Sequence, residues 1–289
     1  MSSFKKDLYE VALVIPASEP AAPALERLKK LSINPEKTVC AQTSGINRHC
    51  FYTPSRKKVL HIERLFSKHF RKPLRLEVRF LRTHDWFDKW KRDYHIGRLG
   101  CKFEIVPEWE RSKHKPSKRI PIFLDPAGAF GSGEHETTRL MVRMLEACSG
   151  RFESFLDVGT GSGILSIAAS KLGAKQILGL DVDLASVRAA RNNLKSNGCE
   201  EFRVLHKKLE TLKIRKPFDL VGANLFTDVL IREKRRLLSR VKPGGFLALS
   251  GILNQHFDEL RQVYRSPKLR RVAFHRSRKW TGVLFQRKN

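Results

Sequence analysis

The sequence predicts an α/β protein in which a mostly parallel sheet follows a small α+β domain. Residues 155–181, FLDVGTGSGILSIAASKLGAKQILGLD, have the pattern of strand, glycine turn, helix, strand and terminal acid. The chain has 289 residues, more than the roughly 100 to 200 of a typical domain, so we expect two domains. We predict a first domain at residues 1–82, a linker at 83–120 and a second domain at 121–289.

Composition narrows the class of protein further. Apolar residues make up 41% of the chain, enough for real cores, and no apolar run reaches the roughly 18 residues of a membrane span. The first apolar stretch is too short for a signal peptide, so we expect a cytoplasmic protein. The five cysteines are odd in number and never form CxxC, which argues against a disulfide framework or a zinc site. We expect a monomer without a metal.

The first 82 residues have a recurring alternation of apolar strands and amphipathic helices. We predict strands and helices, in order, over Leu8–Ile15, Ala21–Leu31, Thr38–Gln42, Arg48–Thr53, Ser55–Phe70 and Pro73–Phe80, with a turn at Ser44-Gly45. The order βαββαβ favours a ferredoxin-like domain. It carries no cluster typical of a catalytic site, so we interpret it as a recognition module.

The segment 83–120 is expected to be a partly ordered connector. Trp86, Phe87, Trp90 and Tyr94 have helical spacing, which favours packing against a neighbouring domain over base stacking. Residues 110–120, ERSKHKPSKRI, are polar and charged and predict an exposed loop.

Three glycines follow the buried strand that leads to Asp157. They lie at Gly159, Gly161 and Gly163 in the spacing GxGxG, whereas a dinucleotide site has its third glycine one residue later. Asp181 ends the next strand, where a carboxylate can accept hydrogen bonds from both hydroxyls of a ribose. The pattern resembles motif I and the acidic loop of class I S-adenosylmethionine (AdoMet) methyltransferases, and favours AdoMet over NAD. The alternative is a glycine turn that only reverses the chain.

The rest of the second domain alternates between helices and strands. A glycine-rich loop within residues 124–146 runs into Thr137 and Thr138, whose hydroxyls can cap a helix or face a ligand. Asp183 is expected to cap the following helix, and a metal there is disfavoured. Further predicted elements are a helix at Leu184–Asn197, strands from Phe202, Phe218 and Gly245, a helix at Leu225–Ser239, and closing strands at Arg271–His275 and Gly282–Gln286.

Several strings together resemble one methyltransferase family. They are FGSGEHETT, LDVGTGSGILSIAASKLGA, GLDVD, ANL at 223–225, KPGGFLALSGIL at 242–253 and the closing pattern around Trp280. The chain is similar to the PrmA family, which methylates protein eleven of the large ribosomal subunit. The resemblance implies a Rossmann-like class I sheet with an antiparallel edge strand, AdoMet as cofactor, and amino groups of a large-subunit ribosomal protein as substrate.

The resemblance also implies site residues. The second threonine of the loop, Thr138, contacts AdoMet in the family's pattern, and the same pattern assigns Gly159, Asp181 and Asn224 to the cofactor. Phe130, Gly161 and Gly163 are expected at the same site. The loop departs from the family's usual sequence at Ser132, Glu134 and Glu136, which bears on the substrate more than on the cofactor.

The chemistry needs few catalytic groups, because methyl transfer from a sulfonium is an in-line displacement that depends on orientation. A lysine amine must first lose a proton, since its reference pKa is about 10.4. Asn224 is the candidate for holding that amine, with a purely structural asparagine as the alternative. His135 is a candidate base, although a histidine in a glycine loop can equally well hold the loop by a hydrogen bond.

The net charge of +28, from 57 Lys+Arg against 29 Asp+Glu, indicates a polyanionic partner. Ten basic residues and no acid follow Glu259. Contact with rRNA is one interpretation, and a solvated basic surface or an acidic membrane surface are the others. The charge keeps open an rRNA or tRNA methyltransferase, and a non-catalytic RNA-binding protein on a methyltransferase scaffold.

Overall fold

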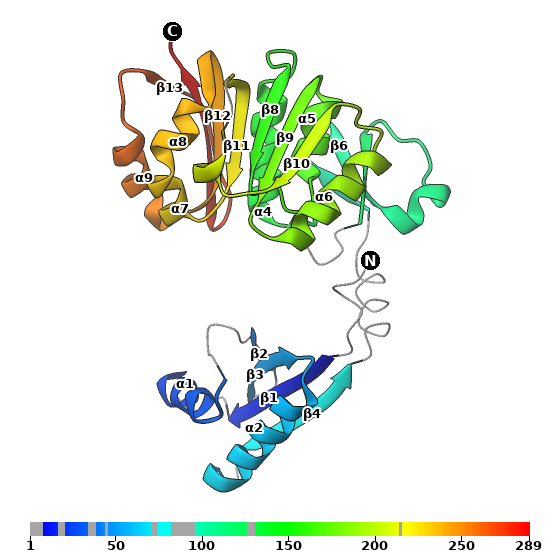
Figure 1. Ribbon diagram of the computed structural model, residues 1–289, viewed down its shortest axis with the longest axis vertical. Helices are drawn as coiled ribbons and strands as arrows, with labels where there is room; N and C mark the ends of the chain where they lie inside the picture. Colours follow the sequence, from blue (N-terminus) through cyan, green and yellow to red (C-terminus); the bar gives the residue numbers. More distant parts are fainter. Residues whose placement is uncertain are drawn as a thin grey trace. The chain divides into compact units, whose positions relative to one another are not determined.

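The computed structural model describes residues 8–16, 21–33, 39–43, 46–70, 74–81, 96–125, 131–213 and 216–289. The chain divides into two compact units, within residues 1–94 and 95–289 (Figure 1). The turn expected at Ser44-Gly45, the aromatic residues expected between Trp86 and Tyr94, and Phe130 lie outside the described residues.

The smaller unit has its elements in the predicted order. They are β1 (Leu8–Pro16), α1 (Ala21–Lys30), β2 (Val39–Thr43), β3 (Ile46–Thr53), α2 (Arg56–His69) and β4 (Arg75–Leu81). The strands form an antiparallel sheet in the order β2-β3-β1-β4. Both helices pack on one face of this sheet, because Leu28 of α1 and Ile62 of α2 share a core cluster with Val11, Leu13 and Ile15 of β1.

The larger unit begins with a small sheet that sequence patterns do not predict. It contains β5 (Gly97–Leu99), β6 (Phe103–Pro107) and β7 (Ile120–Leu124), and a 3-10 helix, η2 (Glu108–Lys113), follows β6. All five residues of β6 are buried. The segment 110–120, expected to be an exposed loop, is mostly exposed. Glu104 of β6 holds it, because its carboxylate contacts His114 Nε2 at 2.9 Å and accepts from Ser117 Oγ at 2.7 Å.

Two asparagines hold the last strand of this small sheet. Asn193 lies in helix α6 (Leu184–Ser196), and Asn197 is the C-cap of that helix. Asn193 Oδ1 accepts from Asp125 N at 3.0 Å and its Nδ2 donates to Asp125 O at 2.9 Å. Asn197 makes the same pair of bonds with Phe123, at 2.9 and 2.6 Å. Side-chain amides four residues apart on a helix thus replace a neighbouring strand along β7. This pairing fixes the chain where it enters the segment before residue 131.

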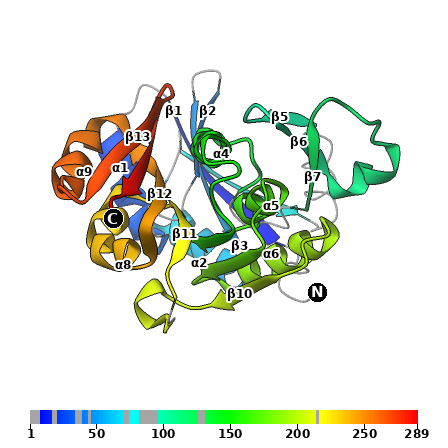
Figure 2. The ribbon, with the colours of Figure 1, turned by 90° about the horizontal axis from the view of Figure 1, so that it is seen from above.

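The core of the larger unit is a seven-stranded sheet. Its other elements are α4 (Glu136–Ala147), β8 (Ser154–Val158), α5 (Ile164–Lys171), β9 (Gln176–Asp181), β10 (Phe202–His206), β11 (Phe218–Asn224), α7 (Thr227–Arg232), α8 (Lys234–Ser239), β12 (Val241–Leu253), α9 (Phe257–Tyr264), β13 (Leu269–Arg276) and β14 (Trp280–Arg287). The strand order is β10-β9-β8-β11-β12-β14-β13. Helices α4, α5 and α6 cover one face, and α8 and α9 cover the other (Figure 2). No helix among the described residues is long and apolar enough to cross a membrane.

The last two strands form the antiparallel edge of this sheet, as expected, and β14 is the strand that runs antiparallel to its neighbours. β14 runs antiparallel to β12 and β13 and lies between them, so the edge strand is β13. The physical reason is composition. Val283, Leu284 and Phe285 of β14 are buried, whereas Arg270 and Arg271 of β13 are exposed and suit an edge. The single helix predicted over Leu225–Ser239 is interrupted, between α7 and α8.

Candidate functional site

Parallel strands bring most of the predicted site residues to one end of the sheet. β8, β9 and β11 are parallel, and β8 lies between the other two. The glycine turn after β8, Asp181 at the end of β9 and Asn224 at the end of β11 therefore share the carboxyl end of the sheet. This is the end where α/β sheets bind ligands.

The glycine turn has left-handed backbone at all three glycines. The φ angles are 77° at Gly159, 54° at Gly161 and 83° at Gly163. Residues with a Cβ disfavour this region by about 1 to 2 kcal/mol each. A Cβ on Gly163 would also lie 3.1 Å from Cα and Cβ of Ala190 on α6. Gly163 thus lets α5 begin in close contact with α6. Because glycine has no side chain, the backbone of the turn is left accessible to a ligand.

Asp181 is fixed by two backbone donors. Its Oδ2 accepts from Gly161 N at 2.9 Å and its Oδ1 accepts from Asp183 N at 2.9 Å. Each oxygen keeps a further lone pair for a ligand. Asp183 caps α6 as predicted, through Ala185 N at 3.2 Å and Ser186 N at 3.0 Å. Hydrogen bonding from Ser186 lowers the pKa of Asp183. The described residues contain no cluster of three His, Cys, Asp or Glu that would hold a metal.

Asp157 is a buried carboxylate directly below the turn, which sequence reasoning treated only as the end of a strand. Its Oδ2 accepts from Thr160 Oγ1 at 2.8 Å and Ser166 Oγ at 2.7 Å. Its Oδ1 is buried and has no partner among the described residues. Burial raises the pKa of Asp157 to about 6. An acid at the end of a fully buried strand, before a glycine turn, is the signal that would have identified it.

Helix α4 is capped by a histidine and not by either threonine, whose hydroxyls were candidates for the cap or for a ligand contact. The N-cap is His135, whose Nδ1 accepts from Thr137 N at 3.3 Å and lies 2.8 Å from Thr137 Oγ1. Asn224 Nδ2 in turn donates to Thr137 Oγ1 at 3.2 Å. One threonine hydroxyl therefore joins the loop before α4 to the end of β11. This contact brings His135 and Asn224, the two predicted catalytic residues, into one hydrogen-bonded chain.

Thr138, which follows Thr137 in the chain, is 1% exposed, and its Oγ1 has no partner among the described residues. Buried hydroxyls normally have hydrogen-bond partners, so an unpaired one beside a ligand-binding turn is informative. Thr138 Oγ1 and Asp157 Oδ1 are two of the three buried side-chain atoms without a partner in the described ranges. Both belong to segments that meet at the carboxyl end of the sheet.

The loop before α4 lies on the glycine turn. Ser162 Oγ donates to Gly131 O at 2.6 Å. Trp280, the first residue of β14, packs edge-on against His135 with ring centroids 5.3 Å apart. Ser277 Oγ donates to Glu136 Oε2 at 2.7 Å, so one of the two unusual acids of the loop fastens it to the β13–β14 hairpin. The loop therefore has contacts on both sides of the site.

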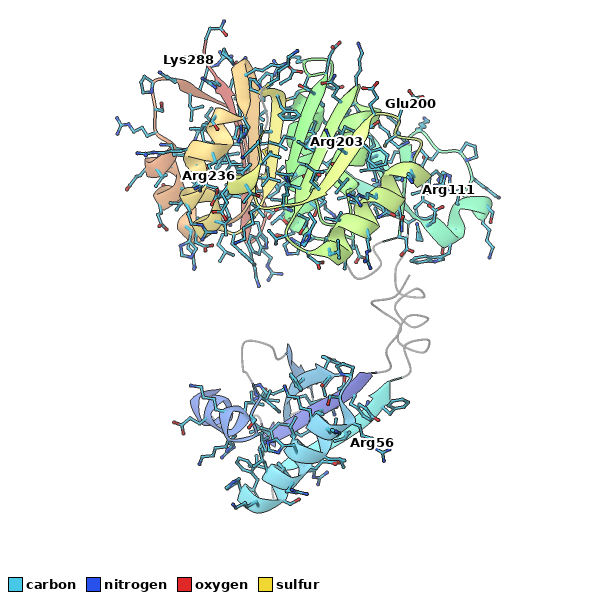
Figure 3. All side chains as sticks on the ribbon, viewed as in Figure 1. Arg56, Arg111, Glu200, Arg203, Arg236 and Lys288 are labelled. Atoms are coloured by element: carbon cyan, nitrogen blue, oxygen red, sulfur yellow. The ribbon has the colours of Figure 1, made fainter. Side chains whose placement is uncertain are left out.

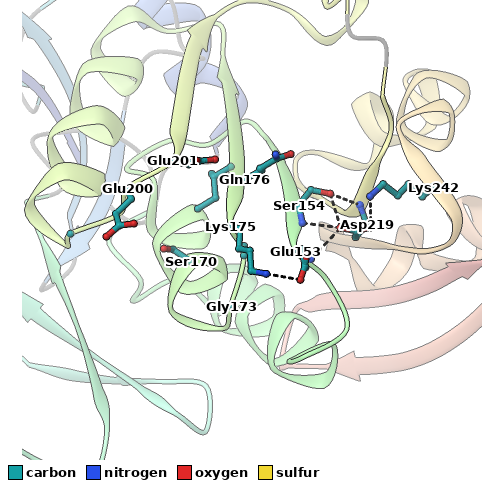
Figure 4. A pocket seen from close by; sticks show the side chains of 13 residues that line it. Glu153, Ser154, Ser170, Gly173, Lys175, Gln176, Glu200, Glu201, Asp219 and Lys242 are labelled. Atoms are coloured by element: carbon teal, nitrogen blue, oxygen red, sulfur yellow. Dashed lines mark hydrogen bonds and ion pairs between the residues drawn. The ribbon is translucent and has the colours of Figure 1, made fainter.

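A hollow of about 740 Å³ lies at the opposite end of the sheet. It is lined by the first residues of β8 and β9 and by Asp219, which accepts from Ser154 Oγ at 2.7 Å and from Lys242 Nζ at 2.6 Å (Figure 4). None of the predicted site residues lines it. The hydrogen bond that Asp219 accepts at the start of β8 indicates that the role of Asp219 is structural.

Comparison with known proteins identifies the family. The model of the family described as ribosomal protein L11 methyltransferase (PrmA) matches residues 19–288. Proteins of that name in Caldanaerobacter subterraneus and Chloroflexus aurantiacus are 36% and 34% identical to this chain. The alignments cover 74% of this chain and 69% of the first relative, and 81% and 78% for the second.

A solved structure gives the same result for the fold. The crystal structure of a ribosomal protein L11 methylase from Lactobacillus delbrueckii matches with a TM-score of 0.62 at 33% identity. The match covers 68% of this chain and all of the solved chain. Because the family match spans nearly the whole sequence, this chain belongs to the ribosomal protein L11 methyltransferase (PrmA) family and is a methyltransferase with AdoMet as its methyl donor.

Proposed function

We propose that this chain transfers methyl groups from AdoMet to amino groups of ribosomal protein L11, at lysine side chains or at the amino terminus. The observation that carries this proposal is the family match over residues 19–288, together with relatives that bear the name of that reaction. The hydrogen-bonded chain that ends on Asn224 supports it by leaving the Asn224 carbonyl oxygen to accept a hydrogen bond from the amine.

AdoMet, in this proposal, binds between the glycine turn and the loop at residues 131–138. A buried polar atom without a partner costs about 1 to 3 kcal/mol, and Thr138 Oγ1 and Asp157 Oδ1 are two such atoms. The charge of Asp157 suits the ammonium group of the methionine part, and the Thr138 hydroxyl suits a polar atom of the same ligand. Asp181, held open by two backbone donors, suits the ribose hydroxyls. The residues present therefore fit the ligand.

When bound, AdoMet supplies an electrophilic methyl carbon to an amine that attacks in line with the departing sulfur. The protein must hold that amine in its neutral form and in line. Thr137 N donates to His135 Nδ1, which makes Nδ1 an acceptor, so the Thr137 hydroxyl can donate to the same nitrogen. The Thr137 oxygen then accepts from Asn224 Nδ2, and Asn224 Oδ1 is left to accept from the amine.

His135 therefore has a positioning role in this proposal. Its Nδ1 already serves the helix cap and the Thr137 hydroxyl, which accounts for its place without proton removal. Its role as a base stays a prediction of the sequence. The two roles differ in their pH dependence, because a base imposes its own titration on the reaction rate and a cap does not.

We propose that the unit within residues 1–94 recognises the substrate. The face of its sheet opposite the helices carries linked charges, with Arg48 paired to Glu77 at 2.5 Å and to Glu10 at 3.4 Å. Tyr52 extends this network by donating to Glu10 at 2.9 Å, and remains 40% exposed. A fixed polar face with an exposed aromatic ring is suited to protein recognition.

The deciding experiment is transfer of a labelled methyl group from AdoMet to ribosomal fractions, with protein and RNA separated afterwards. Label in L11 that maps to lysine or to the amino terminus supports the proposal. Label in RNA would instead support an RNA methyltransferase, which the net charge of +28 favours as the second candidate. We also propose that the enzyme acts as a monomer. Light scattering tests this.

A further inference from the structure

The turn between β13 and β14 is a fixed feature at the mouth of the site. Trp280 pairs with Leu253 at the end of β12, so the turn lies at the same end of the sheet as Asn224. Asn254 holds the turn from below: its backbone N donates to Lys279 O at 3.0 Å, and its Nδ2 donates to Arg278 O at 3.3 Å. The side chains of Arg278 and Lys279 are exposed.

Helix α4 adds two arginines beside this hairpin. A Cβ on Gly282 of β14 would lie 3.0 Å from Leu140 Cβ and 3.1 Å from Met144 Cε, so this face of α4 rests on β14. Arg139 and Arg143 precede these two residues and are exposed.

The pKa of His275 gives independent evidence that Arg143 lies beside the hairpin. His275 pairs with Gly282 across the hairpin, and burial followed by the charge of Arg143 lowers the pKa of His275. Arg143 therefore lies near the hairpin, and Ser277 of the turn contacts Glu136 at the start of α4. Arg276 is set apart, because its guanidinium lies over the rings of Phe257 and Phe274 on the face that α9 covers. We name the exposed residues Arg139, Arg143, Arg278 and Lys279 the basic strip.

The basic strip lacks neutralising partners. None of its members forms an ion pair with a carboxylate of the residues that the structure describes, whereas Arg236 and Arg261 pair with Glu233 and Asp258. Of the nearby acids, Glu136 is engaged by Ser277. Unpaired cations in one place produce a local positive potential, which attracts a polyanion and raises its rate of association.

Protection of a sheet edge does not explain the strip. Cationic residues on edge strands prevent pairing between molecules, and β13 is an edge strand. This accounts for Arg276, which lies on β13 outside the strip. Arg278 and Lys279 lie in the turn, and Arg139 and Arg143 lie on a helix, where no open strand edge needs protection.

We propose that the basic strip binds the phosphate backbone of an RNA at the mouth of the methyl-transfer site. Three of its four members are arginines, whose planar fork matches phosphate oxygens. Other cations of this unit lie elsewhere: Lys288 lies near the start of β12, at the opposite end of the sheet from the strip, and Arg203 lies on β10 at the other edge (Figure 3). A substrate amine that lies next to RNA would then reach the site while the basic strip binds the phosphates of that RNA. This inference does not depend on which amine is methylated.

The test is binding of a 5′-fluorescein-labelled polyuridylate of 20 nucleotides, followed by fluorescence anisotropy across a series of KCl concentrations. Each phosphate contact adds about 0.7 to the slope of log affinity against log salt for a single strand. The variant Arg143→Gln/Arg278→Gln/Lys279→Gln should therefore lose about 2 of that slope. A matched control, Lys195→Gln/Arg203→Gln/Arg235→Gln, removes the same number of exposed arginines and lysines elsewhere on this unit and should keep the wild-type slope.

Further measurements separate loss of the contact from loss of the fold. Both triple variants should bind AdoMet in calorimetry as the wild type does. Arg143→Lys/Arg278→Lys keeps the charges and should keep the slope. Equal loss of slope in both triple variants would mean that net charge alone binds RNA, and would overturn the proposal. A labelled polyaspartate of 20 residues that binds with the same dependence on the strip would assign the surface to an acidic protein instead.

Discussion

Asp181→Asn is the substitution that tests the cofactor site most directly. Each carboxylate oxygen of Asp181 accepts one backbone N–H, from Gly161 at 2.9 Å and from Asp183 at 2.9 Å. An asparagine has only one such oxygen, so its NH₂ group must face one of these donors. The same substitution at Asp183 is a matched control, because both oxygens of Asp183 also accept from backbone N–H groups, yet it caps α6.

The expected sizes of the two effects follow from what each carboxylate holds. Hydrogen bonds to a charged group contribute about 1.5 to 3 kcal/mol. Loss of one such bond to the ribose, with a disturbed turn, should weaken AdoMet binding by about 10- to 150-fold. Asp183→Asn should cost less than about 1 kcal/mol of stability, because asparagine is a good N-cap, and should leave AdoMet affinity within about threefold.

Calorimetric titration with AdoMet measures both affinities, and thermal unfolding checks that both variants are folded. The reasoning requires a large loss of affinity for Asp181→Asn alone. Wild-type affinity in Asp181→Asn would show that the carboxylate does not contact the ligand. An equal loss in both variants would show that the damage comes from a misplaced amide and not from the ribose contact.

Three further predictions concern stability, amine positioning and pH. Gly163→Ala should destabilise the protein by about 1 to 3 kcal/mol more than Gly150→Ala, and urea unfolding measures the difference. Both glycines have similar φ angles, 83° and 75°, but only at Gly163 would the new Cβ press against α6. Thr137→Val should lower kcat about tenfold with unchanged AdoMet affinity, because it releases Asn224; normal kcat would remove the positioning role. Burial raises the pKa of Asp157 to about 6, above the reference value of about 3.9. The folded protein therefore binds the extra proton, and its stability falls as the pH rises between these values. Unfolding without AdoMet should show Asp157→Asn gaining about 2 kcal/mol on the wild type from pH 4 to pH 7.

The elements that local patterns determine were predictable. The glycine turn, Asp181 and the cap by Asp183 each depend on residues within a few positions of one another, and the structure has all three where they were expected. The same holds for the strands of the smaller unit and of the seven-stranded sheet, because alternation or continuous burial of apolar residues is recorded directly in the sequence.

Contacts between distant residues were not predictable. Asn193 and Asn197 pair with Asp125 and Phe123 across about 70 positions, and a polar residue on a helix does not reveal which backbone it will meet. Thr137 and Thr138 were candidates either for the cap of α4 or for a ligand contact, since hydroxyls are usual caps. His135 occupies the cap position instead, and Thr137 bonds to it. His135 and Asn224 were therefore both predicted from the sequence as candidate residues, whereas the hydrogen bonds that join them through Thr137 were not.

The spacing of the glycines and the loop before α4 are parts of one arrangement. In a dinucleotide site the residue at position 164 would be glycine, so that the helix could approach its strand. Here Ile164 is 2% exposed, and a Cβ on Gly131 or Gly133 would lie 3.6 Å or 2.8 Å from its side chain. Ile164 thus supports the loop that carries Gly131, while Gly163 provides the close approach of helices. A glycine at position 164 would leave this loop without its apolar support, so the departure from the dinucleotide pattern is what seats the second wall of the cofactor site.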